Sequence, residues 1–267
     1  MLMRGLRRWA QTQFRRNTTS TLRRSFAQQA AADSSVTSDS SDKVHTVYGW
    51  GRNKFSTLGL GLGEKWITSP QELTTLHCNV KTIKGSVRAS GLLTTDGELY
   101  VWGISGMLAP GTGIRVGMPL PFGNRHPCHE FPYRIDLPDD INVVDFCLTS
   151  GGCIILDDTG NVHSWGEGSG LFMGTSTLGH GDGKSRSSPE RIEFFAEENI
   201  KITQISSGLS HVVALDDEGN VFTWGNGEFG RLGNGSVSTC KGPEELEFFV
   251  DDGVPVKQIF AGGDFAA

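Results

Sequence analysis

The sequence predicts an all-β domain made of repeated four-stranded units, preceded by an N-terminal targeting segment. Glycine accounts for 36 of the 267 residues, as expected where many tight turns join short strands. A Trp-Gly pair occurs four times along the chain, and a glycine-containing turn precedes each of the last three. The first 32 residues have a different character, because they contain seven arginines and no acidic residue.

Residues 1–32 have the composition of a mitochondrial transit peptide. Leu2, Leu6 and Trp9 recur at helical spacing, and the arginines fall largely on another face. Cationic charge of this kind suits import along an inside-negative membrane potential. Residues 23–26 resemble a matrix-processing site with cleavage before the phenylalanine. The alternative is a solvated basic arm or a nuclear localisation signal, although nuclear signals are usually more compact clusters.

The remaining chain divides into a linker and a folded domain. Residues 33–43 are rich in Ser and Asp and cannot form a core, so they predict a polar linker. Residues 44–267 carry the repeats. No run approaches the roughly 18 continuous apolar residues of a transmembrane helix, which leaves open only a peripheral association with the inner membrane.

The charge distribution argues against direct nucleic-acid binding. Seven of the 24 lysines and arginines lie in residues 1–32, which leaves 17 basic against 30 acidic residues in the rest of the chain. Nucleic-acid binders need a basic surface to displace counterions from phosphate. The five cysteines form no CxxC pair, so neither a disulfide framework nor a common zinc motif is predicted; they are Cys78, Cys128, Cys147, Cys153 and Cys240.

The repeated unit is a β-hairpin followed by a Trp-Gly pair, a glycine-rich loop and a strand containing proline. The pairs begin at Trp50, Trp102, Trp165 and Trp224, and the preceding turn glycines are Gly97, Gly160 and Gly219. Apolar strands such as 211–215 and 221–224 flank the turns, and glycine supplies the positive φ that they require. Proline-containing strands are expected at 69–73, 188–195 and 243–249. Each unit thus offers about four short strands, which is the content of one β-propeller blade that must stack on its neighbours.

Residues 206–236, SSGLSHVVALDDEGNVFTWGNGEFGRLGNGS, resemble a repeat of the regulator of chromosome condensation family. The units at 84–103, 148–183 and 47–73 match that pattern progressively less well. WD-repeat blades are shorter and end in Trp-Asp, and the paired glycines of kelch blades are not visible. The resemblance implies a seven-bladed ring, of which about three and a half to four blades are present.

Both ends of the repeat region depart from that pattern. Residues 261–267 align with 207–213 and stop inside a predicted strand, and the first unit lacks the strands before its Trp-Gly pair. We therefore expect a fragment of a longer propeller, with a closed four-bladed ring as the alternative. Residues 106–133 form an insertion that is too rich in Gly and Pro for a strand. Such a loop is either a binding element or a solvated insertion.

No residue pattern predicts catalysis, a metal site or a cofactor. His126, Cys128 and His129 form a tight cluster in the insertion, but a fourth zinc ligand at standard spacing is missing, which favours a plain polar loop. The loop at 59–65 lacks the GxxxxGK[ST] pattern of a phosphate-binding loop.

Structural roles explain the remaining polar and aromatic candidates. The pairs Asp157-Asp158 and Asp216-Asp217 recur with the hairpin turns, so turn chemistry explains them. We expect His211 to be a packed, hydrogen-bonded core residue. The repeated tryptophans are expected to pack between neighbouring blades, with a surface binding stripe as the alternative.

The address and the resemblance together imply a binding scaffold. Mitochondrial members of this family are similar to assembly factors, which implies protein partners in mitochondrial ribosome, RNA or respiratory-complex biogenesis, in the matrix or on the matrix side of the inner membrane. The alternative is guanine-nucleotide exchange on a small GTPase, as the founding member performs on Ran, without covalent chemistry. No counterpart of that member's inserted wedge is evident, and a non-functional truncated product is a third reading. No individual binding residue is predicted.

Overall fold

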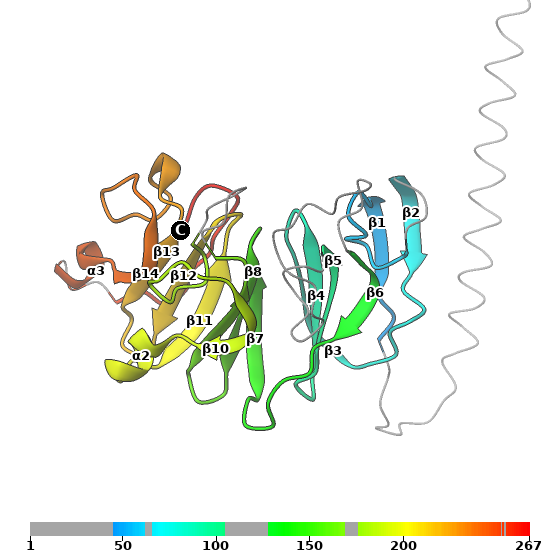
Figure 1. Cartoon of the computed structure of the whole chain (residues 1–267), viewed down its shortest axis with the longest axis horizontal. Helices are drawn as coiled ribbons and strands as arrows, with labels where there is room; N and C mark the ends of the chain where they lie inside the picture. The colour runs from blue at the N-terminus through cyan, green and yellow to red at the C-terminus, as the bar shows by residue number, and fades with distance from the viewer. Residues whose placement is uncertain (1–44, 62–65, 105–127, 169–175, 252, 254) are drawn as a thin grey trace, which may run out of the picture. The chain divides into compact units, whose positions relative to one another are not determined.

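A computed structural model of the chain describes residues 45–61, 66–104, 128–168, 176–251, 253 and 255–267. The predicted transit peptide and linker lie outside these residues. The described part forms three four-stranded antiparallel sheets and one two-stranded sheet, which follow one another along the chain (Figure 1). The all-β prediction with four strands to a unit is therefore confirmed.

Each four-stranded sheet is a meander whose strands pair in sequence order. The two-stranded sheet 1 contains β1 (Tyr48–Arg52) and β2 (Trp66–Glu72). Sheet 2 contains β3 (Val80–Gly85), β4 (Ala89–Thr94), β5 (Leu99–Ile104) and β6 (Cys128–Arg134). Sheet 3 contains β7 (Val143–Leu148), β8 (Gly152–Asp157), β9 (Val162–Gly166) and β10 (Arg186–Arg191). Sheet 4 contains β11 (Ile202–Ser207), β12 (His211–Asp216), β13 (Val221–Gly225) and β14 (Cys240–Glu245). Short helices α2 (Glu193–Glu197), η3 (Glu228–Gly230) and α3 (Glu247–Asp251) occur in the connections of the last two sheets.

The hairpin between the second and third strands of each full sheet has the predicted turn chemistry. The turn glycines Gly97, Gly160 and Gly219 have φ of 88°, 89° and 95°. Asp216 Oδ1 accepts hydrogen bonds from the backbone N–H groups of Glu218 and Asn220, at 2.9 and 2.7 Å. Because this carboxylate closes the turn, its recurrence is structural, as expected.

The outermost strand of every sheet contains a proline, at Pro70, Pro132, Pro189 and Pro243, and its pairing shows a register shift. An edge strand tolerates proline because its outer side needs no backbone donor. The prediction that residues 106–133 contain no strand is wrong for this reason, since β6 starts at Cys128. Residues 105–127 lie outside the described part.

The predicted strands at 188–195 and 243–249 are too long at their C-terminal ends. The chain leaves the sheet after Arg191 and after Glu245 and forms α2 and α3. The helical turn of α2 directs Phe195 into the core, where its ring lies 5.5 Å from Phe222 and 6.0 Å from Trp224.

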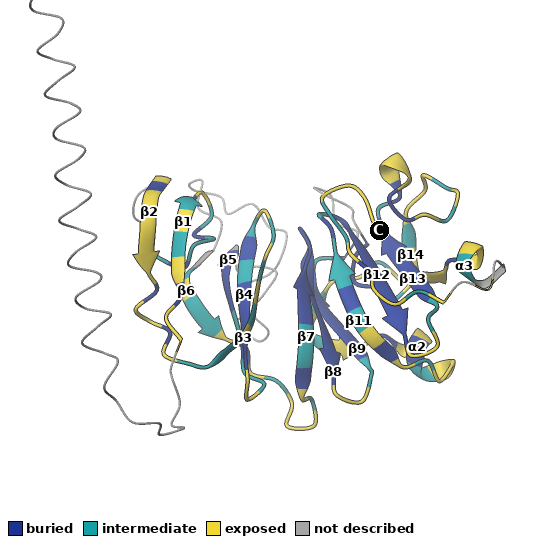
Figure 2. Ribbon diagram, turned by 180° about the vertical axis from the view of Figure 1, so that it is seen from behind, coloured by how far each residue is buried: buried dark blue, intermediate teal, exposed yellow. Residues whose placement is uncertain are grey.

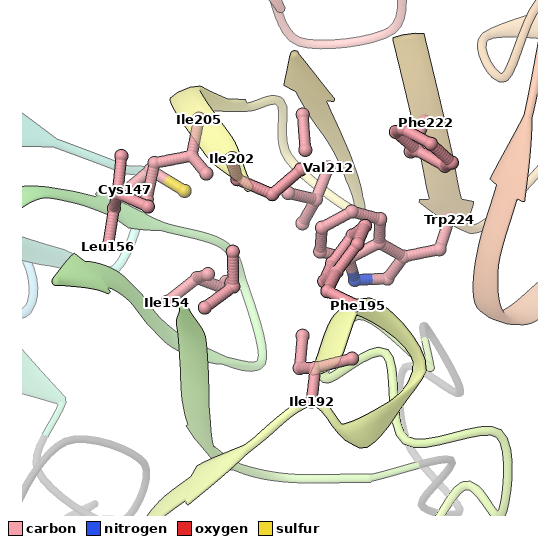
Figure 3. Close-up of a cluster of buried hydrophobic side chains, with 12 residues drawn as sticks. Cys147, Ile154, Leu156, Ile192, Phe195, Ile202, Ile205, Val212, Phe222 and Trp224 are labelled. Carbon is pink, nitrogen blue, oxygen red and sulfur yellow. The ribbon is translucent and has the colours of Figure 1, made fainter. Parts of the chain in front are cut away.

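The core lies between successive sheets, because the middle strands are buried on both faces (Figure 2). Strand side chains alternate between faces, so Ile155 packs toward sheet 2 and Ile154 toward sheet 4. Figure 3 shows the cluster between sheets 3 and 4, in which Ile154 and Phe195 face Val212 and Trp224. An isolated sheet would expose both of these faces, so each sheet requires a neighbour on both sides.

A repeated hydrogen bond joins neighbouring sheets. Trp102 Nε1 donates to the carbonyl of Thr57 at 2.8 Å, and Trp224 Nε1 donates to the carbonyl of Thr177 at 2.8 Å. Each acceptor belongs to the glycine-rich loop of the preceding sheet. A side chain on the loop glycine two residues later would be strained, because Gly179 has φ of 81° and its Cβ would lie 3.0 Å from Trp224 Nε1. The prediction that the tryptophans pack between blades is confirmed for Trp102, Trp165 and Trp224, whose exposed fractions are 3%, 1% and 0%.

Replacement of Trp224 by Phe tests this bond. The variant leaves the buried Thr177 carbonyl without its donor and removes ring volume, so we expect the free energy of unfolding to fall by about 2–4 kcal/mol. Trp66→Phe is the control, because Trp66 is 57% exposed, and it should change the value by less than about 0.5 kcal/mol. Urea denaturation followed by circular dichroism measures both. Equal effects of the two variants would refute the proposed role of the bond.

Candidate functional site

The connections of the sheets gather at two edges of the sheet stack. The hairpin turns between second and third strands lie beside the connections that lead to the next sheet, as shown by the bond from Asp217 N to Lys201 O, 3.0 Å long. We call this the turn edge. The first hairpin of each sheet and the glycine-rich loops lie together at the opposite strand ends, where Arg231 Nη1 donates to Ser210 Oγ at 2.7 Å. We call this the loop edge.

The turn edge is acidic. Its exposed acidic residues are Asp96, Asp136, Asp139, Asp140, Asp158, Glu193, Glu197, Glu198, Asp217, Glu218 and Glu247. The exposed basic residues there are fewer, and two are paired: Arg134 with Glu98 at 2.6 Å and Arg191 with Glu193 at 2.8 Å. A phosphate backbone would be repelled by this edge.

At the loop edge, the glycine-rich loop of sheet 4 is built around the buried guanidinium of Arg231. Its side chain is 3% exposed, and Nε donates to the carbonyl of Glu228 at 2.7 Å. Nη1 also forms an ion pair with Asp264 at 2.9 Å, which ties the loop to the segment that follows sheet 4. These bonds hold the loop in one conformation. Sequence reasoning missed this anchor, because threonine occupies the equivalent position, Thr177, in sheet 3.

The loop of sheet 3 is held by smaller side chains. Thr177 Oγ1 lies 3.0 Å from Thr149 Oγ1, and Ser164 Oγ donates to the carbonyl of Leu178 at 2.6 Å. His180 Nε2 lies 2.9 Å from the same serine oxygen. Burial lowers the pKa of His180, and the positive charge of Arg186 lowers it further, so the ring is neutral at pH 7.

Three exposed apolar side chains stand on the loop edge. Val87 and Val237 are 66% and 68% exposed, and Phe229 is 82% exposed. Phe229 has φ of 62°, which is unusual for an aromatic residue, and its ring lies 5.3 Å from the Arg231 guanidinium. Its counterpart in sheet 1, Phe55, packs against the core cluster between sheets 2 and 3. The loop edge therefore combines rigid loops with apolar contact points.

The polar groups that most resemble a catalytic set are structural. His163 Nε2 lies 2.8 Å from Asp157 Oδ2, and this pair is almost fully buried. The neighbouring Ser164 points instead to Leu178 and His180, as its bonds show. The serine is thus not paired with the Asp-His couple, and its exposed fraction of 0% leaves no access for a substrate.

The pKa of Asp157 reflects this environment. Burial alone would raise it, but hydrogen bonds from Thr159, His163 and Asn161 together outweigh burial and leave the pKa below its usual value. The same carboxylate also receives the backbone N–H groups of Thr159 and Asn161, each at 2.9 Å. Asp157 therefore closes a turn in the same way as Asp216, and in addition fixes His163.

The residues singled out from the sequence have different surroundings in the structure. His126 and the side chains of Cys128 and His129 lie outside the described part of the chain. His211 is fully buried as predicted, and neither ring nitrogen has a partner at ordinary hydrogen-bond geometry among the described residues, although the Phe265 backbone lies close enough to the ring to act on its pKa. Burial and the nearby Arg231 lower the pKa of His211, against the opposing effects of the Phe265 backbone and Asp264. Trp50 differs from the other three tryptophans of the Trp-Gly pairs, because 61% of its surface is exposed, and the prediction that it packs between blades is wrong for the described structure.

Within the described ranges, no three His, Cys, Asp or Glu side chains group together as metal ligands. The same part of the chain contains no helix long and apolar enough to cross a membrane.

Comparisons with known proteins support the repeat assignment. The model of the regulator of chromosome condensation (RCC1) repeat matches residues 159–215 and 218–267. The chain is 28% identical over 223 residues to the human E3 ubiquitin-protein ligase HERC2, and 27% identical over 231 residues to the RCC1 domain-containing protein RUG3, mitochondrial, of Arabidopsis thaliana. It is 29% identical over 191 residues to the secretion-regulating guanine nucleotide exchange factor of Mus musculus.

These matches cover most of this chain but less of the relatives. The alignments include 82%, 83% and 70% of this chain, and 4%, 46% and 38% of the respective relatives. Among solved structures, human WBSCR16 superposes with a TM-score of 0.66 at 23% identity, over 83% of this chain and 52% of that one. The described sheets thus share the fold of that structure, and residues 159–215 and 218–267 match the RCC1 repeat.

The Asp157 carboxylate predicts a pH dependence of stability. Because its folded-state pKa is depressed, its stabilising contribution is present above the unfolded pKa, about 4, and is lost as pH falls below that value. We expect Asp157→Asn to lower the free energy of unfolding by about 2 kcal/mol at pH 7, and the difference from wild type to shrink between about pH 5 and pH 2. Urea unfolding across this range measures it. The exposed neighbour Asp158 supplies the control Asp158→Asn, and a pH-independent difference for Asp157→Asn would contradict the prediction.

Proposed function

Because the chain carries repeats of the regulator of chromosome condensation family, we propose that it is a mitochondrial scaffold whose loop edge binds protein partners. The observation that carries this proposal is the construction of that edge, where buried Arg231 fixes the glycine-rich loop that presents Phe229 and Val237, which are 82% and 68% exposed. Rigid loops with apolar contact points suit protein binding, because little conformational entropy is lost on association.

The proposed mitochondrial localisation is supported by the Arg-rich segment 1–32 and by the similarity to RUG3. The partners that we propose belong to the biogenesis of mitochondrial ribosomes, RNA or respiratory complexes. Outside residues 1–32 the chain has 17 basic against 30 acidic residues, a balance that disfavours phosphate backbones and favours proteins of those assemblies over their RNA.

Nucleotide exchange on a small GTPase is the second candidate, favoured by the 29% identity to the secretion-regulating exchange factor. Exchange requires that the nucleotide-free GTPase binds more tightly than the nucleotide-bound form. It needs no nucleophilic side chain, so the structural role of Ser164 does not argue against it. The two candidates therefore differ in how partner binding responds to nucleotide.

Import is tested by removal of residues 1–32. The full chain fused to a fluorescent protein at its C-terminus should co-localise with mitochondria, and the truncated fusion should not, because the cationic segment is lost. Replacing all seven arginines of the segment by glutamine should have the same effect while the length is kept. Nuclear accumulation of the full-length fusion would contradict the proposed address.

Partner binding is tested by affinity purification from mitochondria, with and without EDTA, GDP or GTP. The scaffold proposal predicts that biogenesis proteins co-purify regardless of nucleotide, whereas exchange predicts a small GTPase that is retained only when nucleotide is stripped.

A loop-edge variant in the same experiment tests whether partners bind at that edge. Val87→Glu combined with Val237→Glu should reduce partner recovery at least tenfold, because charges replace two exposed contact points. Phe248→Glu is the matched control, since Phe248 is 67% exposed on α3, a helix in the connection that follows sheet 4. Equal recovery with both variants would contradict binding at the loop edge.

A further inference from the structure

The glycine-rich loop of sheet 4 contains two Asn-Gly pairs, Asn226-Gly227 and Asn234-Gly235. In such a pair, the backbone nitrogen of the glycine can attack the side-chain amide of the asparagine and close a succinimide ring. Glycine favours this attack, because it has no Cβ to hinder the approach and its backbone adopts many conformations. The two pairs contain the same residue types, so a difference in their reactivity must come from their surroundings.

The first pair is enclosed by the returning part of the loop. A Cβ added to Gly227 would collide with the backbone of Ser238, so the chain passes directly against this glycine. The carbonyl of Gly227 also accepts a hydrogen bond from Gly230 N at 3.0 Å. Ring closure requires the peptide unit between Asn226 and Gly227 to rotate. The packed neighbouring backbone opposes that rotation.

The second pair is open to solvent. No heavy atom lies within 4 Å of a Cβ added to Gly235, and this glycine is exposed, with φ of 74°. Its N–H donates to no backbone carbonyl in the described part of the chain. The peptide unit between Asn234 and Gly235 therefore has room to rotate, and its nitrogen is free to attack.

Both asparagine amides are polarised for attack. Asn234 Oδ1 accepts a hydrogen bond from Ser236 N at 3.1 Å, and Asn226 Oδ1 accepts one from Glu228 N at 2.7 Å. Attack at Cγ places negative charge on Oδ1, and a backbone donor stabilises that charge. Because this feature is common to both pairs, the space around the glycine is what distinguishes them.

We propose that Asn234 is a site of spontaneous deamidation in the folded chain, and that Asn226 is protected. Gly235 N gives its proton to solvent and bonds to Cγ of Asn234. The Cγ–Nδ2 bond then breaks, and Nδ2 leaves as ammonia with a proton from solvent. Water hydrolyses the succinimide at either carbonyl, which gives aspartate or isoaspartate without oxidation or reduction. This reaction does not depend on the proposed partner binding.

The modification would release the loop from the neighbouring strand. Asn234 Nδ2 donates to Glu244 Oε2 at 2.8 Å, which ties the loop to β14. A carboxylate at position 234 has no N–H to donate and repels the carboxylate of Glu244. The loop segment 234–239 then loses this tie, and this segment includes Val237, one of the exposed apolar side chains of the loop edge.

Mass spectrometry of the full chain tests the selectivity. The chain is incubated at neutral pH, with a parallel sample in urea, and then digested with trypsin. Cleavage after Arg231 places Asn226 in the peptide 202–231 and Asn234 in the peptide 232–241. In the folded chain, the amide of Asn234 should convert to acid at least about tenfold faster than that of Asn226, because only its glycine has room to move. In urea the two rates should be similar.

Two results would overturn the proposal. One is conversion of Asn226 in the folded chain at a rate equal to or above that of Asn234. The other is an unconverted Asn234 in the folded chain over a period in which both asparagines react in urea. The urea sample shows that the chemistry and its detection work, so neither result leaves the question open.

Hydrogen exchange tests the consequence for the loop. Asn234→Asp should accelerate amide exchange in residues 234–239, because the tie to β14 is lost. Adding Glu244→Gln to that variant should restore slow exchange, since the glutamine amide donates to the new carboxylate. Glu244→Gln alone is the control and should leave exchange unchanged, because its carbonyl oxygen still accepts from Asn234. Unchanged exchange in Asn234→Asp would refute the proposed release of the loop.

Discussion

The structure depends on the contact between one sheet and the glycine-rich loop of the sheet before it. The indole N–H of Trp102 or Trp224 satisfies a loop carbonyl that would otherwise be buried without a donor. The ring fills space that the adjacent loop glycine leaves open. A single contact thus satisfies a polar group and packs an interface, and its repetition sets the spacing of successive sheets. The loop length between third and fourth strands is then free to vary, since only its glycine-rich end must meet the next tryptophan.

The same contact explains why the loops are rigid without belonging to a sheet. The loop of sheet 3 is held by Trp224 of the next sheet and by its own buried Thr177, and the loop of sheet 4 is held by its own buried Arg231. The loop edge therefore presents apolar contact points, and the turn edge, at the opposite strand ends, presents acidic side chains. Fold alone does not choose a partner for such a surface, so function depends on which side chains stand on the loops.

A repeat whose units need neighbours on both sides leaves its requirements visible at the ends of the series. Trp50 has the position of a buried interface residue but is mostly exposed. Exposed apolar surface of this kind favours association, because burying it removes it from water.

The repeat, the hairpins and the position of the tryptophans could be predicted from sequence, because each depends on local chemistry. The turn at Gly219 is local, because Asp216 accepts hydrogen bonds from the backbone N–H groups of Glu218 and Asn220. Apolar strands such as 211–215 are likewise recognisable without knowledge of their neighbours. The edge strands were harder to predict from sequence, because a proline such as Pro132 is typical of a loop. Only the structure shows that β6 lies at a sheet edge, where no backbone donor is needed. The helix α2 was also not predicted, because the sequence around Phe195 resembles a strand. The helical turn depends on the position of Phe195 in the core.

The candidate site depended still more on the fold. Sequence identified no binding residue, because Arg231 becomes an anchor only where Ser210 and Asp264, far from each other in the chain, meet its guanidinium. Local residue chemistry therefore determined the blades of this protein, while tertiary contacts alone decided which side chains fix the loops and which interface residues are left exposed.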